Sequence, residues 1–122
     1  MRGFSRVCAA VPQCRVADFD LNRKHTLALW QDADAQGAAL VVFPELGLSG
    51  YTARDLFLDG HLLEACRASL RSLIEASKDL APLAVVGLPL RVGDGLYNVA
   101  AAIQGGRLLA VVPKAYLPNY RE

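Results

Sequence analysis

The sequence lacks the features that mark several large classes of protein. Its 13 basic and 12 acidic side chains leave a net charge of +1 with no basic stripe, so we expect no nucleic-acid partner. The longest strongly apolar runs, 38–43 and 83–90, are far shorter than the roughly 20 residues of a membrane span. The N-terminal apolar stretch 7–12 is also too short for a signal peptide. We therefore expect no membrane partner and a cytoplasmic location.

Cysteine and glycine motifs are also missing. Cys8, Cys14 and Cys66 are odd in number and widely spaced. With no CxxC pair, neither a disulfide framework nor a zinc or other metal site is expected. Cys8 and Cys66 fall at apolar positions, which indicates buried structural side chains. The glycines form no GxGxxG fingerprint between a strand and a helix, so dinucleotide binding by this segment is not supported.

What the sequence does contain is the alternating pattern of an α/β domain. It is 53% hydrophobic with only 7% aromatics, which excludes disorder and favours helices packed on a sheet. Capping and periodicity signals predict a helix from Asp18–Asp20 to about Gln36, ended by Gly37, and a second helix from about Asp59 to Lys78. The second helix has an apolar stripe at helical spacing: Leu62, Leu63, Cys66, Leu70, Leu73 and Ile74. We predict strands at 6–13, 38–43, 83–90, 96–103 and 107–112. This order predicts a mixed sheet, with the last two strands forming a hairpin through 104–106.

Two charged residues follow apolar strands. Glu45 comes after the strand 38–43 and a proline, and Lys114 comes after the strand 107–112 and a second proline. In α/β folds the carboxyl ends of strands are where ligands bind. A carboxylate there can act as a general base, and a lysine can stabilise an oxyanion. On position alone, a turn cap or a solvated surface charge is the more frequent role of either residue.

The sequence around Glu45 and Lys114 favours a catalytic role over a turn cap or a surface charge. VVFPELGLSGY (41–51) resembles the glutamate motif of the carbon-nitrogen hydrolase, or nitrilase, superfamily, and VVPKAYLPNYRE (111–122) resembles its lysine motif. The stretches SGYTARDLFLD, LYNVAAAIQGGRLLAVVPK and LPNYRE resemble the N-terminal amidase domain of glutamine-dependent NAD synthetases. The resemblance extends along the whole chain. It implies a partial α-β-β-α sandwich in which residues 1–122 form the N-terminal part of an amidase domain, incomplete at its C-terminus.

The resemblance also implies roles for particular residues. Glu45 would be the general base and Lys114 the oxyanion-stabilising cation, while Tyr51 and Tyr120 would line a glutamine pocket or pack loops. The nucleophilic cysteine of this family lies beyond the lysine motif, so none of the three cysteines of this chain would be the nucleophile. By the same resemblance, we expect a parent enzyme that hydrolyses glutamine to supply ammonia for NAD synthesis, and a fragment inactive by itself.

The resemblance further implies cofactors and partners. The amidase part would need no cofactor, whereas ATP and magnesium would serve a synthetase domain outside this chain. Glutamine is the implied small-molecule partner, and the parent is expected to be a homo-oligomer. Two alternatives stay open: a stand-alone amidase of the same superfamily, and a non-catalytic fragment or binding module without a nucleophile.

Overall fold

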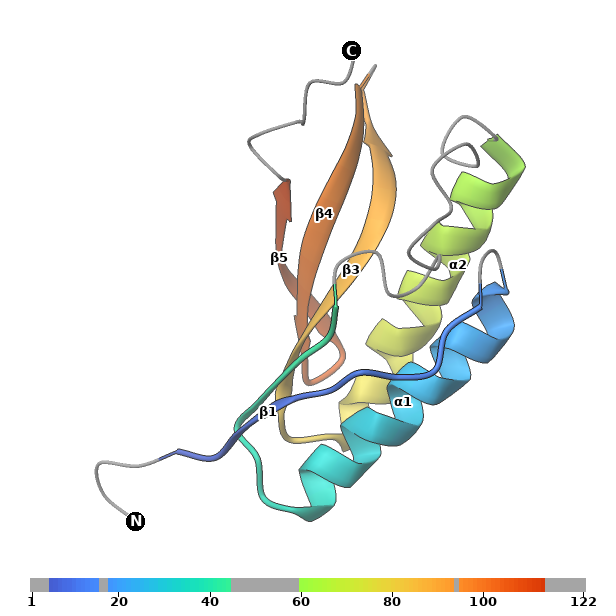
Figure 1. Cartoon of the computed structure of the whole chain (residues 1–122). Helices are drawn as coiled ribbons and strands as arrows, with labels where there is room; N and C mark the ends of the chain where they lie inside the picture. The colour runs from blue at the N-terminus through green and yellow to red at the C-terminus, as the bar shows by residue number, and fades with distance from the viewer. Residues whose placement is uncertain (1–4, 16–17, 45–59, 94, 114–122) are drawn as a thin grey trace.

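The computed structural model describes residues 5–15, 18–44, 60–93 and 95–113. Two long helices pack on one face of a five-stranded mixed sheet (Figure 1). In chain order, the elements are β1 (Val7–Ala9), α1 (Phe19–Ala35), β2 (Leu40–Val42), α2 (Gly60–Ala76), the short 3-10 helix η2 (Ser77–Asp79), β3 (Leu83–Val92), β4 (Gly95–Gln104) and β5 (Arg107–Pro113). The predicted α/β class and mixed sheet are confirmed.

The strand order in the sheet follows the chain, β1-β2-β3-β4-β5. β1, β2 and β3 are parallel, whereas β4 and β5 each run antiparallel to the preceding strand. Parallel connections in one sheet are almost always right-handed. Because both crossovers step in the same direction across the sheet, α1 and α2 lie on the same face (Figure 1). In the described residues no helix covers the opposite face.

Helix α1 begins and ends as its sequence predicts. The Asp18 side chain accepts a hydrogen bond of 3.1 Å from the backbone N–H of Leu21, which is the expected N-cap. After the helix, Gly37 adopts a positive φ of 76°, the left-handed conformation that commonly closes a helix C-terminus.

Helix α2 also follows its predicted apolar stripe, with Leu63, Cys66, Leu70 and Leu73 all buried. It begins at Gly60 and ends at Ala76, after which η2 continues to Asp79. The predicted end at Lys78 therefore falls in the short 3-10 helix. None of the helices in the described ranges is long and apolar enough to cross a membrane.

The core lies between the helices and the sheet and centres on Trp30, whose side chain is fully buried. Its indole N–H donates a 3.0 Å hydrogen bond to the carbonyl of Pro82, which directly precedes β3. This bond ties α1 to the sheet while satisfying a polar group that burial would otherwise leave without a partner.

The hairpin predicted through 104–106 is confirmed. Gln104 pairs with Arg107, and the two residues between them, Gly105 and Gly106, have φ values of 60° and 82°. Positive φ at both central positions is the requirement of a type I′ turn, which glycine meets without strain.

Three strand predictions need correction. The strand expected at 6–13 is only Val7–Ala9, and the chain leaves the sheet after Ala10 donates a last bond to the Val42 carbonyl. The strand expected at 38–43 is only Leu40–Val42. Among the described residues, the helices cover one of its two faces. Val41 is fully buried, but Val42 is 40% exposed. β3 is longer than expected, because it continues to Val92 to pair with β4.

Candidate active site

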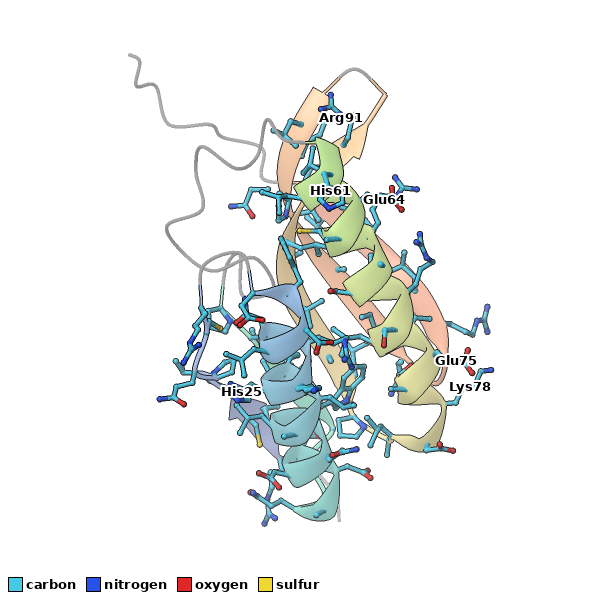
Figure 2. All side chains as sticks on the ribbon, turned by 90° about the vertical axis from the view of Figure 1, so that its right-hand side faces the viewer. His25, His61, Glu64, Glu75, Lys78 and Arg91 are labelled. Carbon is cyan, nitrogen blue, oxygen red and sulfur yellow. The ribbon has the colours of Figure 1, made fainter. Side chains whose placement is uncertain are left out.

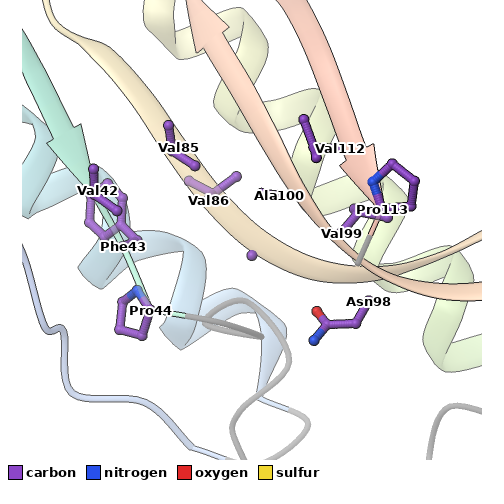
Figure 3. A pocket seen from close by; sticks show the side chains of 11 residues that line it. Val42, Phe43, Pro44, Val85, Val86, Asn98, Val99, Ala100, Val112 and Pro113 are labelled. Atoms are coloured by element: carbon purple, nitrogen blue, oxygen red, sulfur yellow. The ribbon is translucent and has the colours of Figure 1, made fainter. Parts of the chain in front are cut away.

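A pocket of about 370 Å³ opens on the sheet where β2 and β5 end (Figure 3). Pro44, which follows β2, and Pro113, the last residue of β5, both line it. Between them the wall is built from the central strands β3 and β4. The described lining residues are Val42, Phe43, Pro44, Val85, Val86, Gly87, Asn98, Val99, Ala100, Val112 and Pro113.

The sheet topology explains why these two chain segments meet. β5 is antiparallel to β4, which is antiparallel to β3, so β5 runs in the same direction as β2 and β3. Their carboxyl ends therefore share one edge of the sheet. Strands in a sheet are spaced by about 4.8 Å, so β2 and β5 lie roughly 14 Å apart across three intervals. A gap of that size can hold a small substrate together with one side chain that reaches in from each strand end.

The strand register places apolar and small residues near one another across this edge of the sheet. Val42 pairs with Val85 in β3, and the Phe43 N–H donates a 2.9 Å hydrogen bond to the Val85 carbonyl. Two residues further along β3, Gly87 pairs with Ala100, which in turn pairs with Val112 of β5. Gly87 has no side chain and Ala100 has a small one. The surface of the sheet is therefore recessed between the ends of β2 and β5.

The described wall of the pocket is almost entirely apolar. Asn98 is its one side chain with polar atoms, and no described lining residue carries an ionisable group. Any charge acting in the pocket must therefore come from groups other than these described lining residues.

All four predicted site residues lie outside the described residues. Glu45 directly follows Pro44, and Lys114 directly follows Pro113. The structure thus brings together the two residues that precede the predicted base and the predicted cation. Tyr51 and Tyr120 also lie outside the described ranges, and their predicted contribution to a substrate pocket stays a prediction. Asn98 was not singled out in the sequence, where it is one polar residue within an apolar strand.

A second candidate site, containing a cysteine and a histidine, lies at the start of α1. Gln13, Cys14, Arg15, Leu21 and His25 line a hollow of about 300 Å³. The His25 Nδ1 atom lies 2.6 Å from the Gln13 carbonyl oxygen. Because a carbonyl can only accept, Nδ1 carries the proton of this bond.

Cys14 in this hollow is not an activated nucleophile. Its thiol donates a 3.6 Å hydrogen bond to the Pro12 carbonyl, which requires the protonated form. Burial also raises the pKa of Cys14, whereas reactive cysteines have a lowered pKa. This arrangement gives no support for a cysteine–histidine pair that performs nucleophilic catalysis.

The other cysteines are also placed as structural side chains. Cys66 is 1% exposed in the core, and burial raises the pKa of its thiol to about 12. Cys8 is half-buried in β1 and packs against the core. Across the described part of the chain, no group of three or more histidine, cysteine and carboxylate side chains is arranged to hold a metal ion.

Comparison with known proteins shows the family to which this chain belongs. Residues 8–122 match the carbon-nitrogen hydrolase family, and the chain belongs to that family. Its sequence is 45% identical over 120 residues to the glutamine-dependent NAD(+) synthetase of Mycobacterium tuberculosis H37Rv, covering 98% of this chain. The chain spans only 18% of the length of that relative.

Solved structures show the same fold. A glutamine-dependent NAD(+) synthetase from Cytophaga hutchinsonii superimposes with a TM-score of 0.87 at 24% identity, covering 94% of this chain and 20% of that one. An amidase from Nesterenkonia sp. AN1, solved in complex with acrylamide, gives a TM-score of 0.76 at 22% identity, covering 98% of this chain and 46% of that one. The five-stranded sheet with two helices is thus an arrangement that both solved proteins share.

Proposed function

We propose that this chain is the N-terminal part, residues 1–122, of a glutaminase domain that supplies ammonia to NAD synthesis. The observation that carries the proposal is the pocket whose two ends are Pro44 and Pro113. These residues precede Glu45 and Lys114, the two charged residues of the family motifs. The names of the relatives supply the substrate: they are NAD(+) synthetases that depend on glutamine.

The chemistry requires a base, a cation and a nucleophile. In the proposed reaction, a cysteine thiolate attacks the carboxamide carbon of glutamine, and Glu45 takes the thiol proton and passes it to the departing ammonia. Lys114 stabilises the negative oxygen of the tetrahedral intermediate. Water then hydrolyses the thioester and releases glutamate. We assign the nucleophile to a cysteine that lies beyond Glu122 in the intact gene product.

The remaining parts of the proposal concern substrate, cofactors and assembly. Glutamine is the amide substrate, and Tyr51 and Tyr120 are proposed to line its pocket. The amidase step uses no cofactor, while ATP and magnesium serve the synthetase step in another part of the intact gene product. We place the protein in the cytoplasm as a homo-oligomer. A stand-alone amidase is the second candidate, and it is less favoured because the relatives at 35–45% identity are NAD(+) synthetases.

Separate assays of the two nitrogen sources test this proposal. In the intact gene product, Glu45→Gln and Lys114→Met should each reduce glutamine-dependent NAD formation by about 100-fold or more. Formation of NAD from added ammonia should stay within about twofold of wild type, because that step does not use the amidase pocket. If the wild-type protein makes no NAD from ammonia but still hydrolyses glutamine, it is a stand-alone amidase.

The exposed ion pair Glu75–Lys78 offers matched controls. These side chains, from the last turn of α2 and from η2, lie 2.8 Å apart on the surface and are 72% and 58% exposed (Figure 2). Glu75→Gln and Lys78→Met make the same chemical changes away from the pocket, so both activities should be retained. Equal loss of glutamine-dependent and ammonia-dependent synthesis in the Glu45 and Lys114 variants would contradict the assigned roles.

A further inference from the structure

Asn98 occupies an unusual position in the pocket. It lies on β4, half-buried, and it is the single side chain with polar atoms in the described lining. In Figure 3 its amide lies at the lower edge of the pocket, between Pro44 on one side and Pro113 on the other. A carboxamide among valine, alanine and proline side chains has no packing advantage over an apolar residue of similar size.

The strand register places Asn98 at the site edge. Val99 pairs with Pro113, the last described pair between β4 and β5, and Asn98 is the next residue of β4 beyond it. On the other side, Asn98 pairs with Pro89 of β3, two residues past Gly87 in the direction in which β2 ends. Asn98 also alternates along β4 with the buried residues Val99 and Ala101, so it lies on the face that the helices do not cover.

The hydrogen-bonding capacity of Asn98 matches that of a primary amide. A carboxamide offers two N–H donors and an oxygen with two lone pairs. Asn98 already takes part in an interaction of its own, and four hydrogen-bonding positions leave it capacity for a ligand. A substrate carboxamide can pair with it in both directions at once: the substrate NH2 donates to Asn98 Oδ1, and Asn98 Nδ2 donates to the substrate carbonyl.

We propose that Asn98 is a specificity-determining residue that recognises the substrate carboxamide through this two-way pair. The proposal rests on the assignment of the pocket as the amidase site. An ester or a carboxylate in place of the amide lacks the NH2 group, so Asn98 Oδ1 meets an oxygen instead of a donor. Polar groups left without partners in a buried site are what allow strong rejection of such analogues. Asn98 therefore selects the amide over the ester and over the carboxylate product.

The test compares an amide with an ester in the intact gene product. For Asn98→Leu, of similar volume but without hydrogen-bonding groups, kcat/KM for glutamine should fall about 10- to 100-fold. With the γ-methyl ester of glutamate the fall should be smaller, so the amide-to-ester ratio of kcat/KM should drop about 5- to 10-fold, the value of one lost hydrogen bond. Asn98→Asp keeps the acceptor but loses the donors. It should lower kcat/KM for both substrates without lowering their ratio, because the amide NH2 keeps its acceptor.

Gln104 provides the matched control on the same strand. It is exposed and its side-chain amide donates a 3.0 Å hydrogen bond to the Ala81 carbonyl, at the opposite end of β4. Gln104→Leu should leave both kcat/KM values within about twofold of wild type. An amide-to-ester ratio that Asn98→Leu leaves unchanged would overturn the proposal, whether or not both rates fall. If wild-type protein hydrolyses no glutamine, the proposed function fails instead, which is a separate result.

Discussion

Alkylation of Cys66 under native conditions provides a quantitative test of the core. Cys66 is 1% exposed on the sheet-facing side of α2, among the residues of the main hydrophobic cluster. Burial raises the pKa of its thiol to about 12 from an ordinary value of 9.0. Since only the thiolate reacts with iodoacetamide, the protonated thiol of Cys66 should be protected by its pKa as well as by its surroundings.

The expected protection follows from the two pKa values. At pH 8 a thiol of pKa 9.0 is about one tenth thiolate, whereas a thiol of pKa about 12 is about one ten-thousandth thiolate. Cys66 should therefore react at least about 1000-fold more slowly than a cysteine in a short reference peptide, with restricted access adding to this factor. Its rate should still be rising at pH 10, where the rate for the peptide has levelled off.

The assay is iodoacetamide labelling of the intact gene product, with each cysteine followed by peptide mass spectrometry. Exposed Cys14 serves as an internal reference for access. It should react faster than Cys66, although its own raised pKa keeps it slower than the reference peptide. A Cys66 rate within tenfold of the peptide rate, or one that levels off near pH 9, would refute the placement of this thiol in the core.

Three further predictions concern the described helices and turns, each measured by native-state hydrogen exchange in the intact gene product. Asp18→Ala should destabilise α1 by about 1 kcal/mol through loss of the cap on Leu21; unchanged exchange in α1 would contradict the cap. Trp30→Phe should lower the free energy of unfolding by about 2–3 kcal/mol, because the buried Pro82 carbonyl loses its donor and the core loses volume. A decrease below about 0.5 kcal/mol would contradict the buried hydrogen bond between Trp30 and Pro82. Gly105→Ala should destabilise the β4–β5 turn by about 1 kcal/mol. The cause is the backbone strain of alanine at a φ of 60°, because an added Cβ meets no atom within 4 Å. Gly105→Asn should cost less than alanine, and the reverse order would argue against a type I′ turn.

The parts of the fold that the sequence predicts correctly are those set by neighbouring residues. Asp18 caps α1 and Gly37 closes it because a side-chain oxygen and a left-handed glycine act within a few residues of the helix end. The Gly105–Gly106 turn is predicted for the same reason, since the φ values of two adjacent residues define it. The apolar stripe of α2 follows from helical periodicity alone.

The parts that sequence reasoning missed depend on contacts between distant strands. The apolar run 38–43 carries no local signal for where a strand begins and ends within it. The bounds Leu40–Val42 are set by pairing with β1 and β3. The position of Asn98 between the ends of β2 and β5 follows from the strand register, which the local sequence does not reveal.

Covalent trapping of the nucleophile tests the central claim most directly. The intact gene product would be treated with a diazoketone analogue of glutamine, and the modified residue identified by peptide mass spectrometry. The amidase assignment predicts one adduct on a cysteine beyond Glu122, and none in the Glu45→Gln variant. An adduct on Cys8, Cys14 or Cys66, or no adduct on any cysteine of a protein that hydrolyses glutamine, would contradict it.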